Sequence, residues 1–534
     1  MAQSIDKVIL TNTSALKVKY GAAGLRGIQT AVTALIQADK GRGLETRFIS
    51  LDDSVTMKKL SAPAVTAKDN PKQNKNAIDA VYKALTPDYL MLLGSTDVIP
   101  HQDLKNPLYA GPNGDDTDEF AFGDLPYACE APYSQQPHDF VGPTRVVGRL
   151  PDVTGGSDPA YLIDLIKIAA GYKTIDHQAF MNYFGVTAQI WEDSTKLSVT
   201  NTFGSASDLQ DVPPRNFKWK SSQLSRLAHF FNCHGADRSP QFFGQPASGA
   251  HKYPPSMDAA YIGGKISEGT IVAAECCYGG QLYAATNLVP QIGLCNTYLA
   301  NKCYGFFAST TIAYGPSTGN GQADYICQFF LKGVATGASI GRAALQARQQ
   351  FAKIASPPDP SDIKTMAQFN LYGDPSITPI ATPQAYTLPI AIAKKGKAAA
   401  KSRFEANRAE RKDRRRQLYK SGVHIAETEV IPRRTKARAP QGVTKSMRAI
   451  ARKLGWNDGE MLSFNLLHPL ASKTILPKSL TAQPELPTAY HVLFRKPSRA
   501  PRKTEKGAKI PRIAALIGKE VNGKVVSVSE IHSR

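Results

Sequence analysis

The chain has 534 residues, of which 42% are hydrophobic and 20% charged, a composition that excludes a collagen, a coiled coil or a wholly disordered chain. At roughly 150 residues per domain, this length predicts three or four structural units. The net charge of +21 is unevenly distributed: residues 394–534 hold 33 Lys and Arg against 11 Asp and Glu, whereas the first 393 residues are close to neutral. We therefore expect two parts with different physical roles.

Targeting signals and disulfide patterns are not evident in the sequence. No run approaches about 18 consecutive apolar residues, so we expect no transmembrane segment. Residues 1–7 lack the basic region and apolar core of a secretory signal. Seven cysteines, an odd number spread over a long chain, argue against a disulfide framework. These features together predict a cytoplasmic protein.

Strand-like and helix-like segments alternate in the first third of the chain. Residues 90–94 form a short apolar run that ends in glycine, as expected for a buried parallel strand. Residues 144–151 form a second strand-like run, and the apolar residues of 160–171 have helical spacing. We predict an N-terminal α/β subdomain over residues 1–175.

A second series of strand-like runs follows, at residues 184–190, 227–233, 270–274 and 305–309. Each run has the length of a strand and ends at polar or glycine-rich residues. We predict a second α/β subdomain over residues 176–385. The chain would then contain two consecutive α/β sandwich subdomains with mostly parallel sheets. Ligands of such sheets bind beyond the carboxyl ends of the strands.

Residues 386–534 are predicted to be a basic C-terminal extension that is partly helical and partly flexible. Residues 398–420 have the charge of a solvated helix, and residues 484–512 are rich in Pro, Lys and Arg, which is typical of loop or disorder. An Asn-Gly pair at 522–523 lies between β-branched runs and predicts a terminal β-hairpin.

Two of the strand-like runs end at side chains that can do chemistry. One ends at His234 and Gly235, and the next ends at Cys276 and Cys277, which two glycines follow. Adjacent parallel strands would bring these residues to the same edge of a sheet. A thiolate can then attack a substrate carbonyl while an imidazole protonates the leaving amine. The glycines would let backbone N–H groups approach the developing oxyanion.

Other interpretations of these cysteines remain open at this point. A Cys-Cys pair at the end of a strand is also typical of small hydrophobic residues in a core. Cys233, next to His234, should point to the opposite face of its strand. A metal site built from these residues would be possible in principle, but the pairs spaced by two residues that zinc sites use are absent. We therefore predict no metal.

The order of these motifs resembles the caspase-like (clan CD) cysteine peptidases, and most of all their gingipain-like branch. The separation of 43 positions from His234 to Cys277 is close to the roughly 50 found in caspases. Further segments resemble landmarks of that branch in its order: residues 89–100, 124–127, 147–151, 308–314 and 370–376. The resemblance covers about residues 85–380, and it implies a caspase-like or gingipain-like fold and a cysteine peptidase.

The resemblance also implies roles for individual residues. His234 would be the catalytic histidine, and the N–H groups of Gly235 and Cys277 would hold the oxyanion. The family favours a nucleophile with a glycine three residues later and a large apolar residue two further on. That pattern begins at Cys277 rather than at Cys276, which is the less favoured nucleophile.

A third catalytic residue and a specificity pocket follow from the same resemblance. An acidic residue after an earlier strand orients the histidine in this family, and Glu192 or Asp193 is the nearest match. The gingipain-like branch implies Arg or Lys beside the cut bond and a buried carboxylate in the pocket. Asp237 and Asp324 are the candidates, with Tyr314 in the loop that walls the pocket. A carboxylate that caps a helix or faces solvent is the alternative for both.

We therefore predict a cysteine endopeptidase that acts on a protein or peptide through Cys277 and His234. The alternative is a catalytically inactive scaffold that binds nucleic acid or another polyanion through residues 394–534. If the enzyme cuts after Arg or Lys, the clusters of Lys and Arg in residues 394–534 are cleavage sites for the enzyme itself. The extension would then serve targeting, regulation or autoprocessing. A solvated charged segment is the simpler interpretation. No cofactor is predicted, and an activating ion such as calcium is left open.

Overall fold

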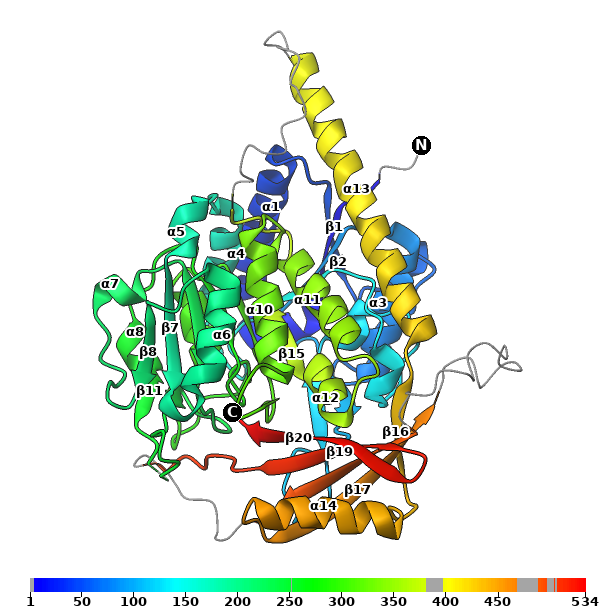
Figure 1. Ribbon diagram of the computed structural model, residues 1–534. Helices are drawn as coiled ribbons and strands as arrows, with labels where there is room; N and C mark the ends of the chain where they lie inside the picture. Colours follow the sequence, from blue (N-terminus) through cyan, green and yellow to red (C-terminus); the bar gives the residue numbers. More distant parts are fainter. Residues whose placement is uncertain (1–3, 251, 381–396, 468–487, 497–503, 505–506) are drawn as a thin grey trace.

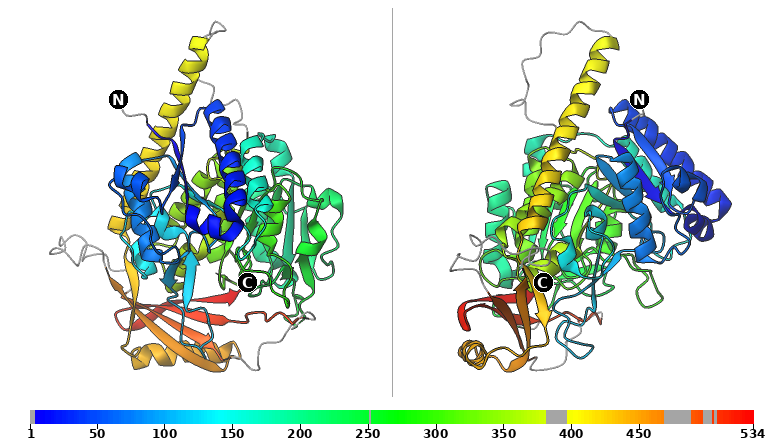
Figure 2. Two further views of the ribbon diagram at one scale, coloured as in Figure 1. Left: turned by 180° about the vertical axis from the view of Figure 1, so that it is seen from behind. Right: turned by 90° about the vertical axis from the view of Figure 1, so that its right-hand side faces the viewer.

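The computed structural model describes residues 4–250, 252–380, 397–467, 488–496, 504 and 507–534 (Figures 1 and 2). A ten-stranded sheet runs through the molecule in the order β2-β1-β3-β6-β15-β13-β12-β9-β7-β8. The strands are β1 (Lys7–Thr11), β2 (Thr46–Ser50), β3 (Tyr89–Leu93), β6 (Val147–Leu150), β7 (Tyr183–Ala188), β8 (Leu209–Val212), β9 (Ala228–Asn232), β12 (Ile271–Ala274), β13 (Gly305–Ser309) and β15 (Phe369–Tyr372).

The predicted α/β fold with a mostly parallel sheet is confirmed. Neighbouring strands are parallel throughout this sheet except for β13 and β15, which are antiparallel. Strands β2, β1, β3 and β6 come from residues 1–175 and the other six from residues 176–385, so the two predicted segments supply adjacent blocks of one sheet. The carboxyl ends of β9, β12 and β13 therefore lie at one edge.

Helices cover both faces of this sheet (Figures 1 and 2). Helices α6, α10 and α11 pack together on one face, and α1 packs with α4 on the other. The longer helices are α1 (Thr13–Gly41), α3 (Pro71–Leu85), α4 (Ala160–Gly171), α6 (Glu192–Phe203), α10 (Gln322–Ala335), α11 (Ile340–Ile354) and α12 (Pro360–Gln368). The shorter ones are α2 (Ser54–Lys59), α5 (His177–Met181), α7 (Ser221–Leu224), α8 (Ala259–Ile262) and α9 (Leu294–Ala300).

Local sequence signals explain where several of these helices begin. The Asn12 side chain accepts a hydrogen bond from the backbone N–H of Ala15 at the start of α1. Ser339 does the same for α11, and α12 begins with an Asp cap followed by proline. Two short antiparallel ribbons form separate two-stranded sheets. They are β4 (Gln102–Lys105) with β5 (Phe120–Gly123), and β10 (Gln241–Phe243) with β11 (Pro255–Asp258).

The described residues of the C-terminal extension form two helices and five strands of a second sheet. Helix α13 (Lys397–Thr428) runs along α11 and leads into strands in the order β14-β20-β19-β18-β17-β16. These strands are β14 (Tyr314–Gly315), β16 (Ile431–Thr435), β17 (Asp458–Leu467), β18 (Ala489–Arg495), β19 (Ala514–Val521) and β20 (Lys524–Ser533), and α14 (Gln441–Lys453) packs against them. One edge strand, β14, belongs to the preceding α/β segment, so the two parts share a sheet.

Two predictions for the extension have different outcomes. The turn at Asn522 and Gly523 joins β19 to β20, and both residues have positive φ, as an Asn-Gly hairpin requires. The prediction of loop or disorder for residues 484–512 is wrong for residues 489–495, which form β18 with β17 and β19 on either side. Much of the remaining segment lies outside the described residues. Among the helices that the structure describes, none has the length and apolar character needed to cross a bilayer.

Candidate active site

The two strand ends that lead to the candidate catalytic residues His234 and Cys277 lie side by side. Strands β9 and β12 are parallel neighbours, with Phe231 opposite Ala274, so the chain beyond both strands leaves the sheet at the same edge. A Cβ atom on Gly235 would lie 1.7 Å from the carbonyl oxygen of Cys277. Only glycine permits this close approach of the two backbones. The motif after β9 therefore contacts the motif after β12 through main-chain atoms.

The two adjacent cysteines have different surroundings. The Sγ of Cys277 lies 3.5 Å from the carbonyl oxygen of Ala313, in the loop after β13. Burial raises the pKa of the Cys277 thiol to about 12. Cys276 instead interacts with Cys233, whose Sγ lies 3.7 Å from the carbonyl oxygen of Val186 in β7. All three thiols are buried, but only Cys277 lies beside the loop that follows β13.

The imidazole of His234 is held by an amide and two aromatic rings. Its Nε2 lies 2.7 Å from Oε1 of Gln245, and the ring centroids of Trp191 and Tyr253 are 4.4 and 5.1 Å away. Because the Gln245 amide nitrogen donates to the carbonyl oxygen of Gly249, its oxygen faces the ring, and His234 Nε2–H donates. The other ring nitrogen, Nδ1, is buried and has no hydrogen-bond partner among the described residues.

Burial lowers the pKa of His234 to about 3, so the ring is neutral at physiological pH. The predicted orienting acid does not contact it. Glu192 lies in the first turn of α6, where it is partly exposed and pairs with Lys196, and Asp193 is exposed. Carboxylates at a helix N-terminus are stabilised by the helix dipole, which explains their position. Gln245, not Glu192, is the residue that hydrogen-bonds the His234 ring.

Arg534 occupies the space between these groups. Its carbonyl oxygen lies 3.2 Å from the backbone nitrogen of Cys277 and 3.5 Å from that of Gly235, and both N–H groups donate to it. Its own backbone N–H donates to the carbonyl oxygen of Ala313 at 3.0 Å. Arg534 is fully buried. The two predicted oxyanion donors therefore converge on one carbonyl oxygen of the chain itself.

The guanidinium of Arg534 fills a closed pocket. Its Nη2 lies 3.2 Å from a carboxylate oxygen of Asp324 and donates to the carbonyl oxygen of Pro316 at 2.9 Å. Its central carbon lies 4.6 Å from the ring centroid of Trp191. Asp324 is itself fully buried, and its Oδ1 accepts a hydrogen bond from Ser194 at 2.6 Å. Asp324 is thus the carboxylate of this pocket, and it also caps α10, because its Oδ2 accepts a hydrogen bond from the backbone N–H of Gly321 at 3.2 Å.

The backbone that leads into the pocket belongs to a short pair of strands. Strands β14 and β20 are antiparallel, with Tyr314 opposite Ser533 and Gly315 opposite His532. A Cβ on Gly315 would lie 2.2 Å from Nη2 of Arg534, so a side chain at this position would clash with the guanidinium. Tyr314, predicted as a pocket residue, contributes its main chain here, while its hydroxyl donates to Asp116 at 2.8 Å.

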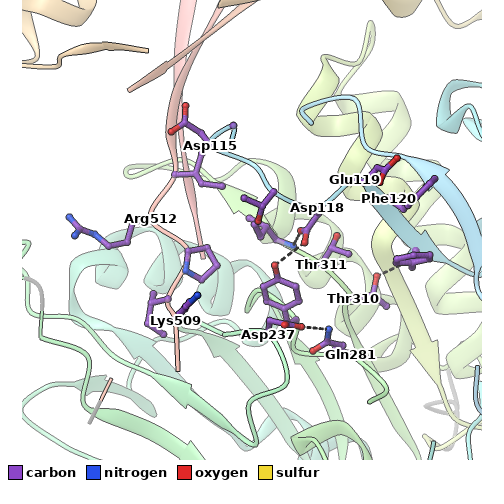
Figure 3. Close-up of a pocket in the computed structure, with 18 of the residues that line it drawn as sticks. Asp115, Asp118, Glu119, Phe120, Asp237, Gln281, Thr310, Thr311, Lys509 and Arg512 are labelled. Atoms are coloured by element: carbon purple, nitrogen blue, oxygen red, sulfur yellow. Dashed lines mark hydrogen bonds between the residues drawn. The ribbon is translucent and has the colours of Figure 1, made fainter. Parts of the chain in front are cut away.

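Asp237, the second predicted pocket carboxylate, lies elsewhere. It lines a cavity of about 1570 Å³ next to the site, between the α/β part and the C-terminal sheet (Figure 3). There it accepts a hydrogen bond from Gln281 at 2.6 Å, and Tyr278 donates to Asp118 at 2.8 Å. Asp237 follows His234 by only three residues and is exposed.

Sequence reasoning missed three side chains of this region, namely Gln245, Trp191 and Glu275. Glu275 directly precedes the cysteine pair and is fully buried. Burial and the nearby Asp324 carboxylate raise its pKa, which favours a neutral carboxylic acid beside the charged pair. Its position at the end of β12 was a signal that could have been used. Gln245 and Trp191 have no local signal, because they come from other loops.

Comparisons with known proteins are sparse. No protein-family model matches the chain, and no curated protein matches it. Among solved structures, the chain is similar to one described as "Structure of Protease", with 12% sequence identity and a TM-score of 0.44. The alignment covers 100% of this chain and 98% of that chain.

Proposed function

We propose that this chain is a cysteine endopeptidase that cuts peptide bonds after arginine. One observation carries the proposal. The main-chain oxygen of Arg534 accepts hydrogen bonds from Gly235 and Cys277, while its guanidinium pairs with Asp324. A peptide bound in the same way would present the carbonyl of its arginine to the Cys277 thiol, and paired backbone N–H groups are the usual means of stabilising an oxyanion.

The chemistry follows from the groups around that carbonyl. Once residues 531–534 have left the site, the proposed first step transfers the Cys277 thiol proton to Nδ1 of His234, which has no hydrogen-bond partner among the described residues, and the sulfur attacks the carbonyl carbon of the peptide. The oxygen becomes an anion held by the N–H groups of Gly235 and Cys277, a contribution of about 3 kcal/mol per donor. The imidazolium then protonates the leaving amine, and a thioester remains. Water hydrolyses the thioester, with His234 taking a proton from the water and returning it to the sulfur.

The pocket favours arginine over lysine. Asp324, the carbonyl oxygen of Pro316 and the indole face of Trp191 surround the guanidinium. Nη2 of Arg534 makes the contacts with Asp324 and Pro316, while Nε and Nη1 are buried without a hydrogen-bond partner among the described residues. The preference for arginine therefore rests on the indole, because a planar guanidinium stacks on an aromatic ring better than an ammonium group does. Arginine is therefore the proposed residue before the cut bond.

Cys277 is the proposed nucleophile, and Cys276 is not. Cys276 interacts with Cys233 in the core, away from the carbonyl oxygen of Arg534. The seven cysteines are all free and buried, which fits the reducing cytoplasm that we propose as the location.

The alternative of an inactive polyanion-binding scaffold receives less support. Several arginines of α13 point inward: Arg408 lies 3.1 Å from Asp6, and Arg415 lies 3.7 Å from Asp88. These arginines form ion pairs within the fold. We assign the basic extension to regulation of the peptidase.

The test uses peptides in which the residue before the cut bond is Arg, Lys or Ala. Cleavage is measured for the wild type and for Arg534→Ala, and each chain is also made with Cys277→Ala or Cys276→Ala. Cleavage after Arg that is lost with Cys277→Ala and retained with Cys276→Ala supports the proposal. No cleavage in either chain, or cleavage that survives Cys277→Ala, would overturn it.

A further inference from the structure

We propose that the C-terminal sheet is an internal inhibitor of this site, because the end of β20 occupies the place of a substrate. This inference rests on the proposed peptidase function and adds how the site is regulated. The occupant is the segment 531–534, and the residue that blocks the pocket is Arg534. Another peptide can bind only after this segment has left.

The segment is bound on both sides by main-chain hydrogen bonds. On one side β20 pairs with β14, and Arg534 N–H donates to Ala313. On the other side it pairs with β19, and Ser533 N–H donates to the carbonyl oxygen of Ile513 at 2.9 Å. The inhibitory segment is therefore an internal strand of the six-stranded sheet, and that sheet holds it in the site.

Occupation by Arg534 excludes a substrate at each recognition element. Both oxyanion donors are engaged by its carbonyl oxygen, and the Asp324 carboxylate is engaged by its guanidinium. The Cys277 side chain is fully buried beside Ala313. A second arginyl peptide needs the same two N–H groups and the same pocket, so the two states are mutually exclusive.

Helix α13 ties the inhibitory sheet to the rest of the molecule. Its ion pairs with Asp6 and Asp88 attach it near β1 and β3, and Tyr490 of β18 donates to the carbonyl oxygen of Pro357 at 2.8 Å. A segment tethered in this way has an effective concentration on the order of 1 mM, so an occupant with a dissociation constant of about 0.1 mM would suppress activity roughly tenfold.

The first measurement compares Arg534→Ala with Arg452→Ala. Arg452 is an exposed residue of α14 in the same extension, so its substitution removes the same charge without opening the pocket. Without the ion pair to Asp324 the segment 531–534 is held less tightly and leaves the site more often. With a fluorogenic arginyl peptide well below its KM, we therefore expect kcat/KM to rise about tenfold or more in Arg534→Ala and to stay unchanged in Arg452→Ala. The free peptide Ile-His-Ser-Arg should inhibit Arg534→Ala competitively.

A second measurement does not depend on catalysis. The rate at which iodoacetamide alkylates Cys277, followed by mass spectrometry, should be higher in Arg534→Ala than in the wild type, because the occupant shields the thiol. Arg534→Gln, which retains a long side chain, provides a second variant if Arg534→Ala melts at a lower temperature.

The two proposals fail in different ways. Cleavage that depends on Cys277 but has the same rate in the wild type and both Arg534 variants overturns internal inhibition and leaves the peptidase. Equal alkylation rates in these chains also overturn the inhibition. Faster alkylation in the Arg534 variants, without cleavage of any peptide, supports the occupied site and overturns the peptidase.

Discussion

The indole ring of Trp191 packs against the imidazole of His234, with ring centroids 4.4 Å apart and an angle of 58° between the planes. The same indole lies 4.6 Å from the guanidinium carbon of Arg534. One side chain therefore contacts both the proposed acid–base residue and the cation in the specificity pocket. The position of the histidine and the fit of the arginine are coupled through a single rigid ring.

Replacing this ring should reduce selectivity as well as rate. In Trp191→Leu the cation–π contact is lost, and we expect the preference for Arg over Lys beside the cut bond to fall about tenfold. Competition between matched Arg and Lys peptides measures this ratio. Phe180→Leu, another buried aromatic of the α/β part, is the control for general loss of packing. An unchanged ratio in Trp191→Leu would mean that the indole does not contact the substrate.

The two carboxylates predicted for the pocket provide a matched pair. Asp324→Asn leaves the guanidinium without its buried counter-charge, so we expect kcat/KM for an arginyl peptide to fall about 100-fold. Asp237→Asn, in the exposed loop that contacts Gln281, should change it less than about twofold. Both variants are measured in the Arg534→Ala chain, where the pocket is free. A larger effect of Asp237→Asn would contradict the pocket assignment.

The pH dependence of activity should respond to the partner of His234. Burial lowers the pKa of this imidazole, and activity requires its neutral form as the base for the thiol. Gln245→Glu places a carboxylate beside the ring, which favours the imidazolium and raises its pKa. The acidic limb of the kcat/KM profile should therefore move to higher pH. Glu192→Gln, which removes only the partner of Lys196, should leave the limb in place; a shift there would restore Glu192 as the orienting acid.

The close approach of Gly235 to Cys277 leaves no room for a side chain. Gly235→Ala would place a methyl group against a backbone carbonyl, so we expect a loss of about 1–3 kcal/mol in the free energy of unfolding and loss of peptidase activity as the oxyanion donors separate. Thermal denaturation and peptide cleavage test both effects. Gly263→Ala is the control, because a Cβ there would contact nothing within 4 Å.

Part of this arrangement could be predicted from the sequence because it depends on short segments. Apolar runs that end in glycine or polar residues indicate buried parallel strands, as at β3, β9 and β12. These strands could be predicted because periodicity and composition are local properties. The placement of His234 and Cys277 at neighbouring strand ends follows from the strand lengths and the parallel topology. The hairpin at Asn522 follows from turn chemistry.

The tertiary structure decided the features that depend on residues far apart in the chain. Nothing in the sequence distinguishes Asp324, in the first turn of α10, from the loop residue Asp237, because the burial of a carboxylate depends on what packs around it in the fold and not on local composition. Gln245 reaches His234 through the β10–β11 ribbon, where no local pattern marks it. Residues 394–534 have the charge of a solvated tail, yet strands β16 to β20 of the described part form one sheet with β14. That long-range pairing brings Arg534 to the strand ends of a segment some 260 residues earlier, because strand pairing joins main chains without regard to their separation in sequence.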